Sequence, residues 1–382
     1  MDPIQSNSQR TFLTLTFYTD CSGNITKDFL ENPGSLASSK IQLLPMLKTA
    51  INNGDNVQIW SLHSETPQDL EIMLSEKNID TVFIGKMSAG PISKQQSMIL
   101  ANTAAVLRLK QRGAKIILFY SDNHFERNDR IGEFYRSIFE FVDLFVTPSK
   151  TLEEIVRRKT NYLKSCITVV DPWQSQKNDF DDENIKNKAR LIWFGQGRNI
   201  DYLISKIPTL LSQCEASKCY ELTILSRADA LRHFKKQLPK KLIGKKQWIF
   251  KFVAWDDFDQ PSQFDKCLLD SSISLIPSDP NDPNKMGVSH NRLVDSIRSG
   301  CITIASPMPS YLELKDLCIL TKNFPRAIDY AIENSNNLIQ KFSALRDPIL
   351  SQFSPASNQK TWKKIIQTNF KDINTKISNA NK

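Results

Sequence analysis

The sequence has 382 residues, of which 40% are hydrophobic and 9% aromatic. This composition is typical of globular proteins and excludes global disorder, and the length suits two domains of ordinary size. The formal net charge of +9 fits an anionic partner such as a nucleotide, a lipid headgroup or a nucleic acid, without choosing among them.

The first 172 residues alternate short apolar runs with longer amphipathic stretches, a pattern that predicts repeated βα units. Caps such as Ser149, before TLEEIVRR, mark where the helices open. This amino-terminal domain is expected to be Rossmann-like. Its predicted strands are TFLTLTFY, NVQIWSL, DTVFIG, AKIILFY, DLFVT and CITVV.

The stretch from 173 to 189 is polar and charged, with no periodic apolar face, and is predicted to be a linker. A second βα series from 190 to 350 is expected to form a second Rossmann-like domain. Residues 351–382 are expected to form a helix that returns to the first domain, followed by a polar tail. The predicted strands of the second series are RLIWFG, ELTILS, WIFKFVAW, SISLIP, CITIAS and LCILT.

The expected fold class is therefore α/β, with two tandem doubly wound parallel sheets and a cleft between them. Seven scattered cysteines without a C-x-x-C pair favour reduced thiols over disulfides or a zinc site. The amino terminus is polar, and no apolar run approaches the roughly 20 residues that span a bilayer. We expect a cytoplasmic protein, and its charge is compatible with peripheral contact at the inner face of a membrane.

The basic run from Lys235 to Lys246 has no interleaved aromatic residues. We therefore expect a solvated face there and no nucleic-acid partner.

The loop after SISLIP, from Ser278 onward, holds the richest group of polar residues at any predicted strand end. It enters an amphipathic helix whose free N–H groups and positive dipole end are suited to an anion, and Lys285 and Arg292 add full charges. Diphosphate is the expected ligand. Asp295, one turn further on, is an acceptor suited to ribose hydroxyls. An ordinary surface loop before an amphipathic helix would also explain these residues.

The run from Asn291 to Gly300, followed by CITIASPMPSYLEL, resembles the donor-binding region of family 4-like glycosyltransferases of the GT-B fold. In that group a helix of the type N-R-L-x-[ED]-x-x-x-x-G precedes a strand and a turn resembling P-x-P-S-Y-x-E. The resemblance implies that Asp295 contacts the ribose, that nearby basic residues hold the diphosphate, and that Asn291 and Ser310 belong to the donor site. More loosely, the resemblance extends over nearly the whole chain. It implies that the domain formed by residues 1–172 lies on the acceptor side and that the domain formed by residues 190–350 binds the nucleotide sugar.

One position departs from the family pattern. Many family members carry an earlier acid that contacts the donor sugar, and that position is Gly287 here. Asp279 and Asp282 are acids close to it, but their spacing does not match. The residue that holds the sugar is therefore unassigned.

Three further strand-end loops supply candidate residues. In YSDNHFERNDR, His124 is suited to hydrogen-bond the donor sugar or the leaving phosphate, and Asp122 either joins it or caps the next helix. In WFGQGRNIDYL, a ligand can approach closely at Gly195, and Arg198 is a second candidate phosphate contact. After ELTIL, Ser226 is expected to line the nucleobase pocket.

In ENPGSLASSK, Gly34 and Ser38 are candidates for the acceptor side or for a phosphate contact. A simple loop and helix cap would explain these two residues equally well.

Together these features predict a glycosyltransferase that uses a nucleotide-diphosphate sugar and a glycan or lipid-linked acceptor, in glycan or cell-envelope biosynthesis. Cations at the departing phosphate would lower the barrier, so we expect Lys285, Arg292 and His124 to be catalytic. No D-x-D pair follows SISLIP, so we expect no metal and no other cofactor. The resemblance implies retention of anomeric configuration.

Two alternatives remain open. A sugar-nucleotide epimerase or hydrolase could use the same scaffold, because a fold does not determine a reaction. A non-catalytic protein that binds nucleotide sugars is the second, and Gly287 is the residue that favours it.

Overall fold

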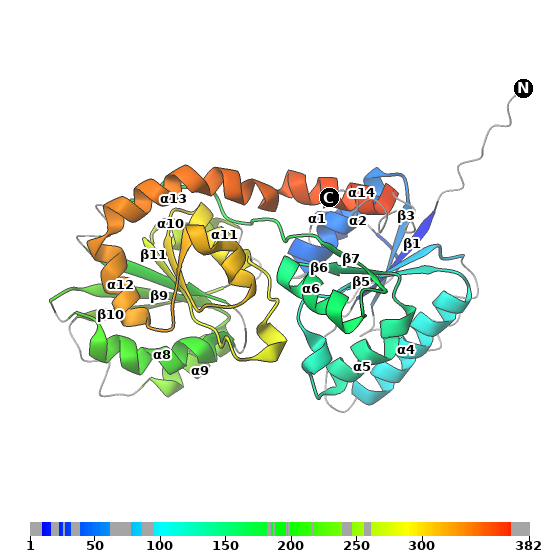
Figure 1. Cartoon of the computed structure of the whole chain (residues 1–382), viewed down its shortest axis with the longest axis horizontal. Helices are drawn as coiled ribbons and strands as arrows, with labels where there is room; N and C mark the ends of the chain where they lie inside the picture. Colours follow the sequence, from blue (N-terminus) through cyan, green and yellow to red (C-terminus); the bar gives the residue numbers. More distant parts are fainter. Residues whose placement is uncertain are drawn as a thin grey trace, which may run out of the picture. The chain divides into compact units, whose positions relative to one another are not determined.

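The structure is a computed structural model. It describes residues 10–16, 23–25, 27–31, 39–61, 78–85, 95–181, 185, 188–195, 197, 199–215, 217–238, 247–255 and 261–367. The chain divides into two compact units. Unit 1 comprises Met1–Asp171 together with Pro355–Lys382, and unit 2 comprises Pro172–Ser354. Each unit is built around its own β-sheet with helices on both faces (Figure 1).

The sheet of unit 1 has the strand order β2-β3-β1-β4-β5-β6-β7. Its neighbouring strands are parallel except for β2, which pairs antiparallel with β3. The strands are β1 (Thr11–Thr16), β2 (Gly23–Asn24), β3 (Asn56–Ser61), β4 (Thr81–Ile84), β5 (Lys115–Phe119), β6 (Leu144–Thr147) and β7 (Ser165–Thr168).

Helices cover both faces of this sheet because successive strand side chains point to opposite sides. Leu13 and Leu15 pack in a core with residues of α4, α5 and α6, whereas Phe12 packs in a second core on the other face with α2. The helical segments are α1 (Lys27–Glu31), the π-helix η1 (Ser39–Leu43), α2 (Leu44–Asn52), α4 (Gln95–Gln111), η3 (His124–Glu126), α5 (Arg130–Ile138), η4 (Phe139–Phe141) and α6 (Lys150–Lys159).

The last described helix, α14 (Pro355–Gln367), completes the second core of unit 1. Its Trp362 is 1% exposed and contacts Phe83 edge to face, with 5.7 Å between ring centroids. The backbone of α14 is held as well, since Arg10 Nη1 donates to the Ile366 carbonyl at 2.9 Å. Residues near both ends of the chain therefore share one core.

The sheet of unit 2 is parallel, in the order β10-β9-β8-β11-β12-β13. Numbered within the unit, this order is 3-2-1-4-5-6, in which the direction of strand progression reverses between β8 and β11. The strands are β8 (Ala189–Phe194), β9 (Tyr220–Ser226), β10 (Trp248–Ala254), β11 (Ile273–Ile276), β12 (Ile302–Ala305) and β13 (Cys318–Leu320).

As in unit 1, alternate residues of β8 pack in two cores on opposite faces of the sheet. Leu191 and Trp193 pack with residues of α8, α9 and α12, whereas Ile192 and Phe194 pack with Leu268 of α10 on the other face. The helical segments are α8 (Asn199–Gln213), α9 (Ala228–Gln237), α10 (Pro261–Leu269), η5 (Pro283–Lys285), α11 (Asn291–Arg298), η6 (Ser310–Leu317), α12 (Phe324–Glu333), α13 (Ser335–Leu350) and η7 (Ser351–Phe353).

The described part of the segment predicted as a linker, 173–181, packs within unit 2 against the end of α11. Asn178 N donates to the Arg298 carbonyl at 3.0 Å. The next turn needs Gly300, which has φ +80° and at which a Cβ would collide with the Asp179 carbonyl oxygen. The sequence pattern did not reveal this packing because polar and backbone contacts form it.

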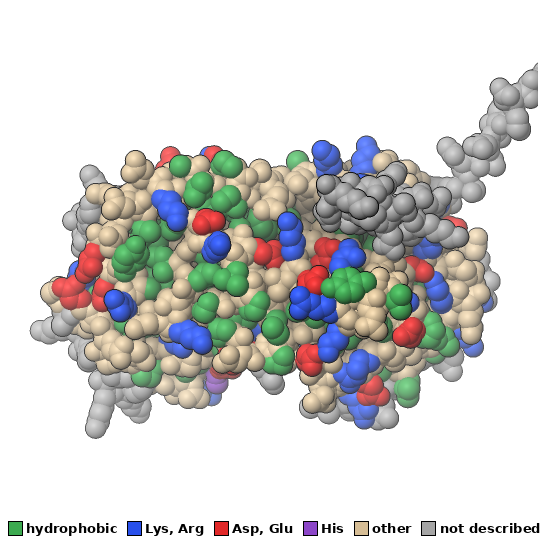
Figure 2. Space-filling model, in the orientation of Figure 1, with side chains coloured by type: hydrophobic (Ala, Val, Ile, Leu, Met, Phe, Trp, Pro, Cys, Tyr) green, Lys and Arg blue, Asp and Glu red, His purple; other side chains and the backbone are tan. Residues whose placement is uncertain are grey.

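No helix in the described ranges combines the length and hydrophobicity needed to cross a bilayer. On the face drawn in Figure 2, basic and acidic side chains are intermixed.

Candidate functional site

The candidate site lies at the carboxyl ends of the unit 2 strands, where the strand order reverses. Gly195 directly follows β8, and Ser278 lies two residues beyond the end of β11. Arg292, the second residue of α11, reaches both: its Nη2 is 3.5 Å from Ser278 Oγ, and its Nη1 is 3.7 Å from where a Cβ of Gly195 would be. Open parallel sheets bind ligands at such reversal points.

The guanidinium of Arg292 is incompletely paired. Its Nη1 atom is buried and has no hydrogen-bond partner among the described residues. A buried donor left unsatisfied costs about 1–3 kcal/mol, and more when it is charged. A charged donor that has no partner is suited to an anion, and the Gly195 backbone, which carries no side chain, lies beside it.

The start of α11 adds to the positive potential. The N-cap is His290, whose side chain makes no capping hydrogen bond. Asn291 N donates to Ser289 Oγ at 3.3 Å, and the next N–H groups and the positive end of the helix dipole face the loop. His290 Nε2 lies 2.9 Å from the Ser310 carbonyl oxygen, which joins η6 to the start of α11. Asn291 is the first residue of α11, and Lys285 ends η5 in the loop that precedes it.

Further polar atoms around this loop are buried without a partner in the described part of the chain. Such atoms are uncommon in native proteins and require an explanation, and a bound ligand is one. Together with Arg292 Nη1 they form a group that a polar ligand could satisfy. They are Asn284 Oδ1, His290 Nδ1 and Ser310 Oγ.

Tyr202 of α8 is a site residue that the sequence analysis missed. Its hydroxyl lies 3.5 Å from Asp282 Oδ2. Burial raises the pKa of Tyr202, as do the charges of Asp282 and Asp279, whereas Arg292 lowers it. The tyrosine is therefore close to all three charges. The sequence contained one signal for this residue, namely its position in the first turn of the helix that follows the Gly195 loop.

Asp295, which was predicted to contact the ribose, makes hydrogen bonds within unit 2. Its carboxylate is buried, and Oδ1 accepts hydrogen bonds from Gln174 N at 2.7 Å and Ser175 N at 3.0 Å. Asp295 therefore anchors the segment at 174–175 to α11. Contact with the ribose stays a prediction.

Ser226, which was predicted to line the nucleobase pocket, lies at the end of β9. Its hydroxyl is buried and donates to the Gly195 carbonyl at 2.6 Å, so it ties the ends of β8 and β9 together. The hydroxyl thereby helps to shape the turn at Gly195, and its place in a nucleobase pocket stays a prediction.

The two described candidates of unit 1 follow β5. His124 is 1% exposed, and its ring stacks on Tyr135 with 4.2 Å between centroids and 1° between planes. Asp122 is half-buried, and its carbonyl accepts from His124 N at 2.9 Å. Asp122 caps no helix: Asn123 precedes η3, and Asp129 caps α5. A catalytic role for His124 stays a prediction.

Three other candidates, Gly34, Ser38 and Arg198, lie outside the described residues. Within unit 2, the structure brings Arg292, Gly195, Asn291 and Ser310 to one end of α11. It places Asp295 and Ser226 in structural hydrogen bonds.

No protein-family model matches the sequence, and no curated protein sequence matches it either. Solved structures do match. Anabaena HepE in complex with UDP and glucose has a TM-score of 0.61 at 11% identity, over 94% of this chain and 99% of that chain. The lipopolysaccharide outer core galactosyltransferase WaaB, in its apo form, has a TM-score of 0.55 at 12% identity, over 93% and 99%.

An α-glucosyltransferase in complex with UDP-glucose and DNA containing an abasic site has a TM-score of 0.55 at 10% identity, over 94% of this chain and 99% of that chain. At these identities the likeness shows the fold. The chain has the GT-B fold of these glycosyltransferases, with two Rossmann-like domains, as predicted. Membership of family 4 stays a prediction.

Proposed function

We propose that this protein is a glycosyltransferase that moves a sugar from a nucleotide-diphosphate donor to an acceptor, with the diphosphate bound at the start of α11. The observation that carries this proposal is the buried Arg292 Nη1, which has no partner among the described residues and lies beside Gly195 where the strand order reverses.

The solved structures with this fold support the choice of ligand. HepE was solved with UDP and glucose, and the α-glucosyltransferase with UDP-glucose. A diphosphate also fits the local chemistry, because a guanidinium and the N–H groups at a helix start are both donors suited to phosphate oxygens. Charge-assisted hydrogen bonds of this kind contribute about 1.5–3 kcal/mol each.

The same groups account for catalysis. When the glycosyl bond breaks, negative charge builds on the departing phosphate, and fixed donors aimed at that charge lower the barrier. Arg292 and the first N–H groups of α11 are held in place by the fold, and Lys285 adds a second cation from the preceding loop. Transfer thus requires little reorganisation of the protein.

Contacts to the donor hydroxyls need acceptors in place of the acid that is absent at position 287. We assign this role to Ser310, whose hydroxyl is buried without a partner among the described residues, and to Asp282, which faces Tyr202. Retention of configuration, independence of metals and a catalytic His124 stay predictions. The α-glucosyltransferase with this fold was solved with DNA, so the absence of a nucleic-acid partner also stays a prediction.

A panel of nucleotide sugars, tested with and without cell-envelope acceptors, distinguishes the possible activities. Release of nucleotide that depends on an acceptor supports transfer. Conversion of the donor without an acceptor indicates an epimerase or hydrolase, and binding without turnover indicates a non-catalytic protein. Either of the last two results would contradict the proposal.

The diphosphate contact is tested with Arg292→Ala and Lys285→Ala. Each should weaken binding of the preferred nucleoside diphosphate, Arg292→Ala by about tenfold or more, because a charge-assisted hydrogen bond is lost. Binding of the corresponding nucleoside should change little. Isothermal titration calorimetry measures both, with Arg326→Ala, an exposed cation on α12, as the matched control. Unchanged diphosphate affinity in Arg292→Ala would exclude the assignment.

A further inference from the structure

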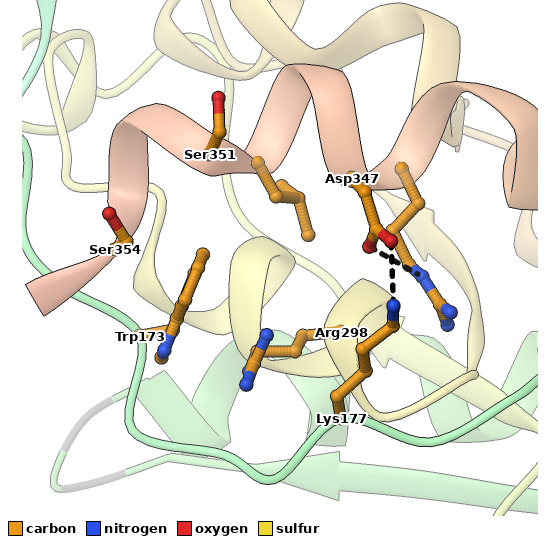
Figure 3. Close-up of a pocket in the computed structure, with 8 residues that line it drawn as sticks. Trp173, Lys177, Arg298, Asp347, Ser351 and Ser354 are labelled. Atoms are coloured by element: carbon orange, nitrogen blue, oxygen red, sulfur yellow. Dashed lines mark hydrogen bonds and ion pairs between the residues drawn. The ribbon is translucent and has the colours of Figure 1, made fainter. Parts of the chain in front are cut away.

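Figure 3 shows a cavity of unit 2 that has a volume of about 300 Å³. It lies at the end of α11 opposite to Arg292. Arg298, the last residue of α11, lines it together with Trp173 and Lys177 of the segment that enters the unit. The end of α13 supplies Asp347 and Leu350. None of these residues belongs to the candidate donor site.

Two of the three basic residues that line the cavity are paired. Lys177 Nζ lies 2.6 Å from Asp347 Oδ2, and Arg346 donates to the Asn178 carbonyl and pairs with Asp179 at 3.2 Å. Arg346 is 4% exposed, so it contributes positive charge to the wall of the cavity but little accessible surface. The cavity therefore has a positive wall in which Asp347 is the one lining acid.

Arg298 differs from the other two. Its Nε donates to the Ser175 carbonyl at 2.9 Å, and the guanidinium stacks on Trp173, with Cζ 4.0 Å from the ring centroid. In the part of the chain that the structure describes, its two terminal nitrogens have no hydrogen-bond partner and no carboxylate within 4.0 Å. Figure 3 shows these nitrogens beside the Trp173 ring.

Nearby acidic groups neutralise the positive charge of Arg298 only in part. Partial burial lowers the pKa of Arg298, and the charge of Arg346 adds to this effect, although Asp295 and Asp347 oppose it. Stacking on Trp173 fixes the guanidinium plane, which leaves its edge with two parallel N–H donors. Such an edge matches the oxygens of a carboxylate or a phosphate.

A carboxylate and a phosphate differ in charge and in number of oxygens. A carboxylate brings one negative charge and two oxygens, and Lys177 already has the carboxylate of Asp347. A dianionic phosphate brings a second negative charge and a third acceptor oxygen, so it neutralises Arg298 and Lys177 together more completely. Leu350 and the Trp173 ring provide apolar surface for a small body beyond the phosphate.

We propose that this cavity binds the phosphate group of a small soluble molecule, held by the edge of the Arg298 guanidinium and by Lys177. The site is separate from the donor site, since Arg292 and Arg298 lie six residues apart, at the two ends of α11. The site contains residues from both ends of unit 2, since Trp173 and Ser354 line it. These two ends are joined by a hydrogen bond that Trp173 N donates to the Phe353 carbonyl at 3.0 Å.

Tryptophan side chains allow the two sites to be observed separately in the full chain. The protein has six tryptophans, so a ¹⁵N-labelled indole spectrum contains few signals, and Trp173→Phe identifies the signal of Trp173. The Trp193 ring lies 3.2 Å from where a Cβ of Gly195 would be, and its signal reports the donor site. Inorganic phosphate and glycerol phosphate, added at constant ionic strength, should shift the Trp173 signal saturably, and acetate should not.

Variants connect this shift to the proposed contacts. Arg298→Gln should weaken phosphate affinity, read from Trp173, by about tenfold or more, because the forked donor is lost. Asp347→Asn should strengthen it by a few-fold, because Lys177 is released from its competing acid. Arg326→Gln, an exposed cation on α12, is the matched control and should change nothing.

A Trp173 signal that does not saturate, or that responds only to phosphatidylglycerol vesicles, would overturn the proposal. Equal phosphate affinity in Arg298→Gln and the parent would do so as well. If Arg298→Gln does not fold, the gain in Asp347→Asn decides the question, and its absence refutes the site. The response of Trp193 to nucleoside diphosphate is read independently, so failure here does not affect the proposed glycosyl transfer.

Discussion

The carboxyl group of Asp295 is buried between α11 and residues 174–175, and burial raises its pKa to about 6. Hydrogen bonds from Gln174 N and Ser175 N act in the opposite direction without cancelling the effect. The folded protein therefore binds a proton here more tightly than the unfolded chain, whose aspartates titrate near pH 3.9. The protonated carboxyl of Asp295 therefore makes its full contribution to stability below about pH 3.9. This contribution is lost as the pH rises through about 6.

This environment predicts a pH-dependent effect of Asp295→Asn. Asparagine keeps an oxygen that can accept from both N–H groups but does not ionise. The free energy of unfolding of the variant, relative to the parent, should therefore rise by up to about 3 kcal/mol between pH 4 and pH 7, since each pKa unit corresponds to about 1.4 kcal/mol.

Urea denaturation at pH 4, 5.5 and 7 measures this difference. Asp347→Asn is the control, because Asp347 is exposed and its pKa is lowered by Lys177 rather than raised by burial. A difference between Asp295→Asn and the parent that is constant over this range would show that Asp295 is not the titrating group.

At this scale the sequence revealed positions better than contacts. Arg292, Asn291 and Ser310 were predictable because a strand end, a loop and a helix start occur in order around them. For Asp295 and Ser226, which were predicted to contact ligand, the structure adds hydrogen bonds to backbone groups of the protein. Their partners are backbone groups far away in the sequence, 121 residues in the case of Gln174 and Asp295, and no periodic pattern encodes such a contact.

Among the elements, α14 makes the clearest contribution to stability. Trp362 fits against Phe83 and Phe119 in a core that also contains residues of α2. Removing a buried tryptophan costs the transfer free energy of the ring and leaves a cavity.

Trp362→Ala should therefore destabilise unit 1 by about 3–5 kcal/mol. The unfolding transition of unit 1, followed by hydrogen exchange of its strand amides, should move, and that of unit 2 should not. Lys363→Ala replaces the exposed neighbour in the same helix and should have little effect. A loss below about 1 kcal/mol in Trp362→Ala would contradict the role given to α14.

The elements themselves were largely predictable. Each of the twelve predicted strands overlaps a strand of one of the two sheets, and β7, β8 and β9 begin one residue earlier than predicted. The agreement arises because buried parallel strands are continuous apolar runs. The strand missed was β2, which has two residues, Gly23 and Asn24, and pairs with β3 without an apolar run of its own. The contacts of residues 173–181 with α11 were missed for a related reason, since they are polar.

On the scale of the whole molecule, unit 2 is one continuous stretch of chain inserted into unit 1. Its two cores, and the described residues of the proposed diphosphate site, lie within residues 172–354. This organisation implies that unit 2 has the interactions needed to fold alone.

A fragment comprising residues 172–354 should unfold cooperatively and bind the nucleoside diphosphate within about tenfold of the parental affinity, because Arg292 and the start of α11 are retained. Circular dichroism and calorimetry measure these properties. A fragment comprising residues 1–171 is the comparison and should lack a cooperative transition, since it has no Trp362. An unfolded 172–354 fragment would contradict the division into units.

The discontinuity of unit 1 also has a consequence for synthesis on the ribosome. Residues 10–171 emerge early, but α14, which covers one face of their sheet, is made only after the whole of unit 2. At about 5–20 residues per second, this delay is roughly 10–40 s. During that time unit 2 can fold as it emerges, while the surface around Phe83 and Phe119 awaits its covering helix. Although unit 1 begins first, it is completed last, and chaperones have their longest opportunity to bind at that exposed face.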